Sequence, residues 1–184
     1  MKTISTITAA LLLASAAILA LAPPAVAQAI ASAQPPGALT RDDDKAIRKT
    51  LMGVETAWNT HDMKAFGSLF TEDAEWINIV GMHWRGREAV VKAHAIFHEI
   101  MFKNHQLKTD DIKVRSLGGS HAIAVVTTTN DAFTTPDGRV MERAQNRLTY
   151  VLSNGPDGWK IAHGHNVRVD ADAANNDPVN SRPK

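Results

Sequence analysis

The sequence has 184 residues, no cysteine and a formal net charge of +1 at pH 7. The absence of cysteine excludes disulfides, thiolate nucleophiles and cysteine-ligated metals. The near-zero charge, spread along the chain, gives no basic footprint for nucleic acid or for an anionic membrane, so neither is an expected partner.

The first 27 residues have the features of a secretory signal peptide. Lys2 supplies a short basic start, residues 7–22 are almost wholly apolar, and Ala25-Val26-Ala27 offers a small-x-small cleavage pattern, with Ala31-Ser32-Ala33 as a second site. The apolar run is short for a membrane span, which needs about 20 residues, and an uncleaved anchor is the alternative. We therefore expect a periplasmic or secreted protein without a membrane partner after cleavage, in which residues 28–40 form a linker.

Three helices are predicted in the first half of the folded part, which spans residues 41–169. The first follows the hydroxyl cap candidate Thr40 and carries acidic residues in its first turn. Its apolar stripe has helical spacing and consists of Ile47, Leu51, Val54 and Trp58. A short second helix carries Met63, Phe66, Leu69 and Phe70. A strand over residues 74–80 and a third helix over residues 87–102 complete this half.

The second half of the folded part is rich in Val, Ile and Thr, and it predicts four strands. They cover residues 106–117, 120–133, 139–152 and 158–169, and turn residues separate them. Helices followed by antiparallel strands indicate an α+β fold, with helices covering one face of a curved sheet. Residues 170–184 lack apolar periodicity, and we expect a flexible tail there.

The last predicted hairpin suggests a register. If it closes around residues 154–158, Leu152 faces Trp159, and side chains at every second position share one sheet face. The pairs that follow are Tyr150 with Ile161, Leu148 with His163, and Asn146 with His165. This face is apolar near the turn and polar farther away, as in a cavity with an apolar closed end and a polar mouth. A slip of one residue would move these side chains to the other face.

Several short segments resemble SnoaL-like domains. They are Ala57 to Asp62, Leu69 to Trp76, Gly81 with Trp84-Arg85-Gly86-Arg87, His94, and Gly158 to His165. The sequence therefore resembles the nuclear-transport-factor-2-like superfamily, and within it the SgcJ/EcaC-type subgroup. The resemblance implies a cone-shaped pocket between the three helices and the curved sheet, and a homodimer formed through the outer sheet face. It does not fix a function, because proteins of this fold include enzymes and binding modules.

Histidines are the candidate catalytic residues. His94 and His98 are four residues apart on the third helix, and His163 and His165 are two apart on the last strand, so each pair shares a face. His94 and His165 are our candidates for moving protons, because imidazole titrates near neutrality. Asp131 is a candidate base if it faces inward. Four converging histidines can also hold Zn or Cu, but no carboxylate spacing supports a metal.

The remaining candidates are ligand-binding residues. An aromatic wall with amide and imidazole groups suits a small apolar or ring-bearing molecule. We predict that this wall contains Trp58, Trp76, Asn78, His98, Met101, Asn146, Tyr150 and His163. For Trp58 and for any single histidine, a purely structural place in the core is the alternative.

The sequence contains no phosphate loop, nucleophile motif or dinucleotide fingerprint, and we expect no cofactor. The leading hypothesis is an exported small-molecule pocket protein, with any chemistry being cofactor-free acid–base catalysis such as isomerisation, cyclisation or hydration. The alternatives are a non-catalytic ligand-binding or assembly module and a histidine-rich metal-binding protein.

Overall fold

A computed structural model describes residues 37–179. The predicted signal peptide and most of the predicted linker therefore lie outside the described residues. Helix α2 (Arg41–Asn59) begins as expected. Thr40 caps it in a capping box: the Thr40 hydroxyl accepts from the Asp43 backbone N–H at 3.0 Å, and the Asp43 carboxylate accepts from the Thr40 N–H at 3.0 Å. The buried face of α2 consists of Ile47, Leu51, Val54 and Ala57.

The next elements begin and end differently from the prediction. Helix α3 (Met63–Ser68) stops before Phe70, which opens strand β1 (Phe70–Ile77). The prediction placed Phe70 in the helix because its apolar spacing is helical. Pairing with a distant strand overrides this local pattern, since Phe70 lies opposite Ile161 and the Ile161 N–H donates to the Leu69 carbonyl at 2.9 Å.

The expected loop before the third helix contains a short strand, β2 (His83–Arg85), which pairs with β1. Helix α4 (Arg87–Ile100) follows, and its buried residues are Val90, His94 and His98. The helix therefore turns the two histidines of the His-x-x-x-His pattern toward the protein interior, and not toward solvent.

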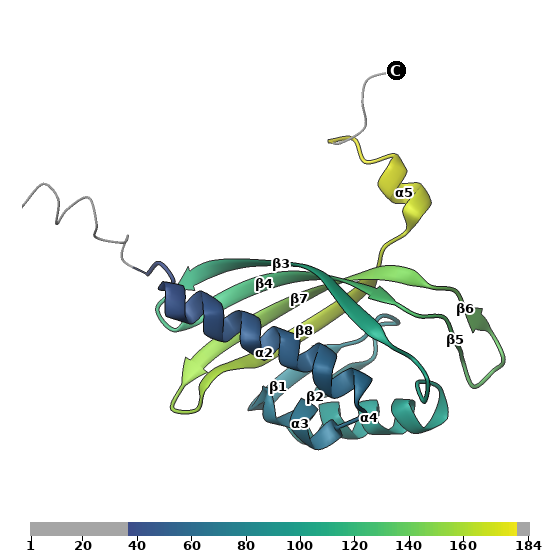
Figure 1. The fold of residues 1–184 in the computed structure, drawn as a ribbon, viewed down its shortest axis with the longest axis horizontal. Coiled ribbons are helices and arrows are strands. Elements are labelled where there is room, and N and C mark those ends of the chain that lie inside the picture. The colour runs from purple at the N-terminus through teal and green to yellow at the C-terminus, as the bar shows by residue number, and fades with distance from the viewer. Residues whose placement is uncertain (1–36, 180–184) are drawn as a thin grey trace, which may run out of the picture. The chain divides into compact units, whose positions relative to one another are not determined.

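Four long strands follow, as predicted. They are β3 (Leu107–Gly118), β4 (His121–Asn130), β7 (Ala144–Gly155) and β8 (Gly158–Arg168). With β1 and β2 they form a curved sheet in the order β2-β1-β8-β7-β4-β3, and α2, α3 and α4 lie along one side of it (Figure 1). The predicted α+β class with three helices on a curved sheet is confirmed. One pair departs from the antiparallel expectation, because β1 runs parallel to β8.

Two predicted strands are shorter than expected because a small hairpin separates them. Strands β5 (Phe133–Thr134) and β6 (Val140–Met141) pair with each other outside the large sheet. The tail begins with a short helix, α5 (Ala171–Asn175), which has no buried residue. No helix within residues 37–179 is long and apolar enough to cross a membrane.

The register of the last hairpin corrects the prediction. The turn is tight, with Gly155 opposite Gly158, so Leu152 lies opposite Ile161 and not opposite Trp159. A bulge follows: Leu152 pairs with Ile161 and Val151 with His163, which leaves Ala162 without a partner on β7. Beyond the bulge, the inward positions of β8 are Gly164 and Asn166, opposite Tyr150 and Leu148.

Consequently His163 and His165 lie opposite Val151 and Thr149, on the outer face of the sheet. The predicted pairings of His163 with Leu148 and of His165 with Asn146 are wrong. The extra residue at the bulge reverses the direction in which every later side chain of the strand points.

Candidate functional site

A cavity of about 360 Å³ lies between the helices and the inner face of the sheet. This volume is within the range of small-molecule sites. Its sheet side carries a gradient from apolar to polar, formed by Val126, Thr128 and Asn130 on β4 and by Asn146, Leu148 and Tyr150 on β7. Its helix side is mostly aromatic and includes Trp58 from α2 and Phe97 from α4.

Seven of the ten residues predicted for the site line this cavity. They are Trp58, Trp76, Asn78, His94, Met101, Asn146 and Tyr150. Their roles in binding or catalysis stay predictions. The other three, His98, His163 and His165, are absent from the lining: the first packs behind Trp58, and the other two lie on the outer sheet face.

His94 is a deeply buried titratable side chain at the cavity. It is 4 % exposed and is surrounded by four aromatic rings, with centroid distances of 4.9 to 6.0 Å, from Trp58, Phe66, Trp76 and Trp84. Burial among these rings lowers the pKa of His94 to about 4, and the hydrogen bond to Val90 only partly offsets this effect. The imidazole is therefore neutral at pH 7.

The tautomer of His94 follows from the same hydrogen bond. Its Nδ1 lies 2.8 Å from the Val90 carbonyl oxygen, and a carbonyl can only accept. Nδ1 therefore carries the proton, and Nε2 presents a lone pair. Because Nε2 makes no hydrogen bond within residues 37–179, it is free to accept a hydrogen bond or a proton from a molecule in the cavity.

His98 belongs to a second group of histidines packed against the far side of Trp58. The Trp58 indole N–H donates to His105 Nδ1 at 3.0 Å, and the ring of Trp58 lies 4.5 Å from that of His98. His98 Nδ1 and His61 Nδ1 are 2.7 Å apart. His98 Nε2 is buried without a partner in the described part of the chain, so a proton there would be an unsatisfied donor. Because two lone pairs cannot bond to each other, one of the two Nδ1 atoms carries the proton and donates it to the other.

Burial, followed by the proximity of His61, His94 and His105, lowers the pKa of His98 to about 4. Burial also lowers the pKa of His105, against the opposing effect of Asp131. Asp131 was a candidate base, but it follows the end of β4 and does not line the cavity. These contacts give the second group a structural role that holds α2 against α4.

The four-histidine metal site proposed from the sequence does not form, because the β8 bulge turns two of its members away from the cavity. Within residues 37–179, no group of three or more histidine, aspartate or glutamate side chains is arranged to hold a metal ion.

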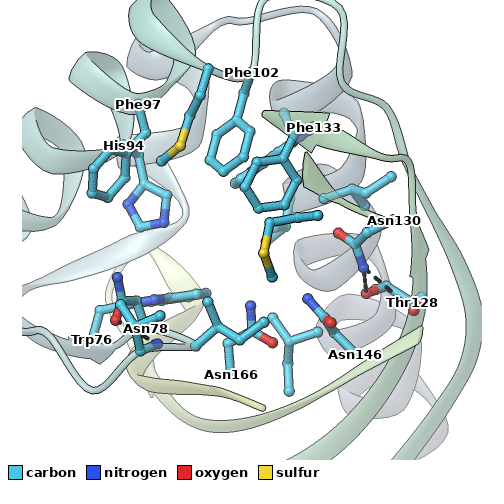
Figure 2. A pocket seen from close by; sticks show the side chains of 18 of the residues that line it. Trp76, Asn78, His94, Phe97, Phe102, Thr128, Asn130, Phe133, Asn146 and Asn166 are labelled. Carbon is cyan, nitrogen blue, oxygen red and sulfur yellow. Dashed lines mark hydrogen bonds between the residues drawn. The ribbon is translucent and has the colours of Figure 1, made fainter. Parts of the chain in front are cut away.

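The structure adds lining residues that the sequence did not indicate. Asn166 faces the cavity because of the bulge, and Phe133 reaches it from the β5–β6 hairpin, where its ring lies 4.9 Å from that of Phe102. Figure 2 shows Asn78, Asn166 and Asn146 along one side of the cavity, opposite His94, Phe97, Phe102 and Phe133. The alternation of side chains along β8 predicts that Asn166 faces the cavity only when the position of the bulge is known.

Trp76 owes its position to a glycine on the neighbouring strand. A Cβ atom on Gly164 would lie 2.4 Å from Trp76 Cε3, so only glycine leaves room for the indole ring against β8. Opposite Gly164 on β7 is Tyr150, whose ring lies 5.9 Å from that of Trp76. Complete burial raises the pKa of Tyr150 far above its usual range, so its hydroxyl stays protonated.

Solved structures share this fold. An uncharacterized protein with a cystatin-like fold from Caulobacter vibrioides is 43% identical, covers 75% of this chain and 97% of its own, and has a TM-score of 0.73. An NTF2-like protein from Novosphingobium aromaticivorans is 16% identical, with coverages of 86% and 96% and a TM-score of 0.58. A ketosteroid isomerase-like protein from Erwinia carotovora atroseptica is 15% identical, with coverages of 71% and 99% and a TM-score of 0.59.

No curated protein matches the chain. The family profile of the SnoaL-like domain matches residues 47–166, which include the helices α3 and α4 and most of the large sheet. This match covers well over half of the chain and agrees with the resemblance of the short segments noted in the sequence. The chain belongs to the SnoaL-like domain family, and it shares its fold with NTF2-like proteins.

Proposed function

We propose that this protein binds a small, uncharged, mostly apolar molecule that carries a ring. The supporting observation is a cavity of about 360 Å³ between aromatic side chains and a polar strip of the sheet. Four of the polar side chains at this cavity are more than nine-tenths buried, namely His94, Thr128, Asn146 and Tyr150. His94 Nε2, the Asn146 amide and the Tyr150 hydroxyl make no hydrogen bond within residues 37–179, and a bound molecule would provide these bonds.

The charges at the cavity favour a neutral ligand. Its charged lining residues are Glu55, Asp137 and Arg139. Glu55 already accepts a hydrogen bond from the Thr109 backbone N–H at 2.7 Å, and Asp137 and Arg139 are exposed on the turn between β5 and β6. An anionic group deep in the cavity would therefore lose its hydration without gaining a cation.

Two adjacent residues of β4 provide a matched test of binding. Val126 lines the cavity, whereas Val125 is 39 % exposed on the opposite face of the sheet. Val126→Phe should weaken binding of the neutral naphthalene dye Prodan about tenfold or more, because the added ring occupies the cavity. Val125→Phe should leave binding unchanged. Dye fluorescence measures both affinities, and equal effects of the two substitutions would contradict the proposal.

Cofactor-free proton transfer at His94 is a second candidate function. It is supported by the neutral imidazole, whose Nε2 lone pair can accept a proton from a bound molecule. A suitable probe is 1-tetralone, whose protons next to the carbonyl exchange with D₂O when a base removes them. We expect the protein to accelerate this exchange, as measured by NMR, and His94→Gln to abolish the acceleration while 1-tetralone still binds. Acceleration that survives His94→Gln would assign the proton transfer elsewhere.

We also propose export to the periplasm or medium and assembly as a homodimer. Export rests on residues 1–27, and the mass of the protein recovered from the periplasm or medium tests it. The proposed dimer surface is the outer face of the sheet, where Val125 and Val167 are 39 % and 45 % exposed.

A further inference from the structure

The amide of Asn78 is held in one orientation by the turn that follows β1. Its Oδ1 accepts from the backbone N–H of Val80 at 3.1 Å and from that of Met82 at 2.8 Å. Because a backbone N–H can only donate, the atom facing these two groups is the oxygen. The NH₂ group therefore occupies the other position of the amide. It makes no hydrogen bond within residues 37–179, and Asn78 lines the cavity.

Two further amides lie on the same side of the cavity as Asn78 (Figure 2). Asn146 is 8 % exposed, and neither its amide oxygen nor its nitrogen makes a hydrogen bond in the described part of the chain. Asn166 lies opposite Leu148, two residues along β7 from Asn146, and its buried Oδ1 has no partner among residues 37–179. Cross-strand diagonal neighbours of this kind are within reach of one ligand group.

The opposite side of the cavity offers a different kind of contact. Phe97, Phe102 and Phe133 present ring surfaces there, and His94 presents a lone pair (Figure 2). A ligand that fits the phenylalanines and the fixed Asn78 NH₂ group has an apolar ring against the former and a hydrogen-bond acceptor toward the latter. Without a cation on the amide side, a neutral acceptor fits better than a carboxylate or a phosphate.

We propose that Asn78 determines specificity by donating from its fixed NH₂ group to a carbonyl oxygen of a ring-bearing ligand. This inference rests on the proposed binding function and narrows the ligand to neutral cyclic or aryl carbonyl compounds. Asn146 and Asn166 complete the polar side of the same site. The turn at residues 78–82 matters for recognition because it prevents the amide from rotating and presenting its oxygen instead.

Asn78→Asp provides a selective test. An aspartate keeps an oxygen for the Val80 and Met82 N–H groups, so the turn is retained, but it replaces the donor with an acceptor. The probes are 1-tetralone and tetralin, which share a ring system and differ in the carbonyl oxygen. We expect the substitution to lower the affinity for 1-tetralone relative to that for tetralin by about tenfold, the effect of one lost hydrogen bond. An unchanged ratio of the two affinities would overturn the inference.

A second measurement does not depend on the variant. In the wild-type protein, the side-chain NH₂ resonances of Asn78 should move on binding 1-tetralone and stay in place on binding tetralin. Movement with neither probe, or equally with both, would refute the role of Asn78. The proposed function fails separately: if neither probe binds, the cavity does not accept ring-bearing molecules, whereas binding of both without discrimination overturns only the inference about Asn78.

Discussion

The neutral state of His94 leads to a quantitative prediction about acid stability. Burial lowers the pKa of this imidazole to about 4 in the folded protein, whereas an unfolded histidine titrates near 6.5. Below pH 6.5 the unfolded chain takes up a proton that folded His94 does not, so the free energy of unfolding falls with falling pH. The contribution of His94 is fully present above pH 6.5 and is lost as the pH falls toward 4.

The size of this effect follows from the two pKa values. Lowering the pH from 7 to 5 should cost about 2 kcal/mol through His94 alone, and the full loss at lower pH is about 3 kcal/mol. Urea denaturation followed by tryptophan fluorescence measures the free energy of unfolding at each pH. The variant His94→Gln has no titrating ring, so between pH 7 and pH 5 it should lose about 2 kcal/mol less than the wild type.

A second histidine substitution controls for general effects of acid. His121 opens β4 at an exposed position, and His121→Gln should show the pH dependence of the wild type. The difference between the two variants reports mainly on His94, because burial, the largest cause of the lowered pKa of His98, is present in both. If His94→Gln and the wild type lose equal stability between pH 7 and pH 5, His94 is not held neutral by burial.

Three further predictions concern packing, capping and assembly. Gly164→Ala should lower the free energy of unfolding by about 1–3 kcal/mol, because its Cβ would collide with Trp76. Gly155→Ala, with no atom within 4 Å of the added Cβ, should change it by less than about 0.5 kcal/mol, and urea denaturation compares the two. Thr40→Ala should cost about 1 kcal/mol in the same assay by removing the N-cap of α2; no loss would mean that α2 needs no cap. Val125→Glu should convert the proposed dimer to a monomer in light scattering, and an unchanged mass would place the interface elsewhere.

The helices could be predicted from the sequence because the information that forms them is local. The cap at Thr40 and the apolar stripe of α2 lie within one stretch of chain, and the structure has the cap and three of the four stripe residues buried as expected, with Ala57 in place of Trp58. The strand at Phe70 could not be predicted, since it depends on pairing with Ile161 far along the chain. The β5–β6 hairpin could not be predicted for a similar reason. Strand β4 ends just before Asp131, whose N–H donates a hydrogen bond to the distant Gln106 carbonyl at 3.0 Å.

The candidate site shows the same division. His94 and Trp76 could be assigned to the cavity from periodicity together with the family resemblance, whereas His98, four residues after His94 on the same helix, does not line it. The β8 residues could not, because a bulge has no reliable local sequence pattern and each side chain after it points to the opposite face.

The bulge on β8 and the glycine after it are parts of one arrangement. If Ala162 were paired and β8 had no bulge, strict alternation from Ile161 would turn His163 and His165 inward, which is the arrangement expected from the sequence. An imidazole at the position where Trp76 packs would collide with the indole, since even a Cβ atom there lies 2.4 Å from it. The bulge places Gly164 beneath Trp76 and Asn166 in the cavity instead. One unpaired residue therefore completes a row of amide side chains on the polar side of the cavity. The imidazole at the cavity is then that of His94, on the opposite side (Figure 2).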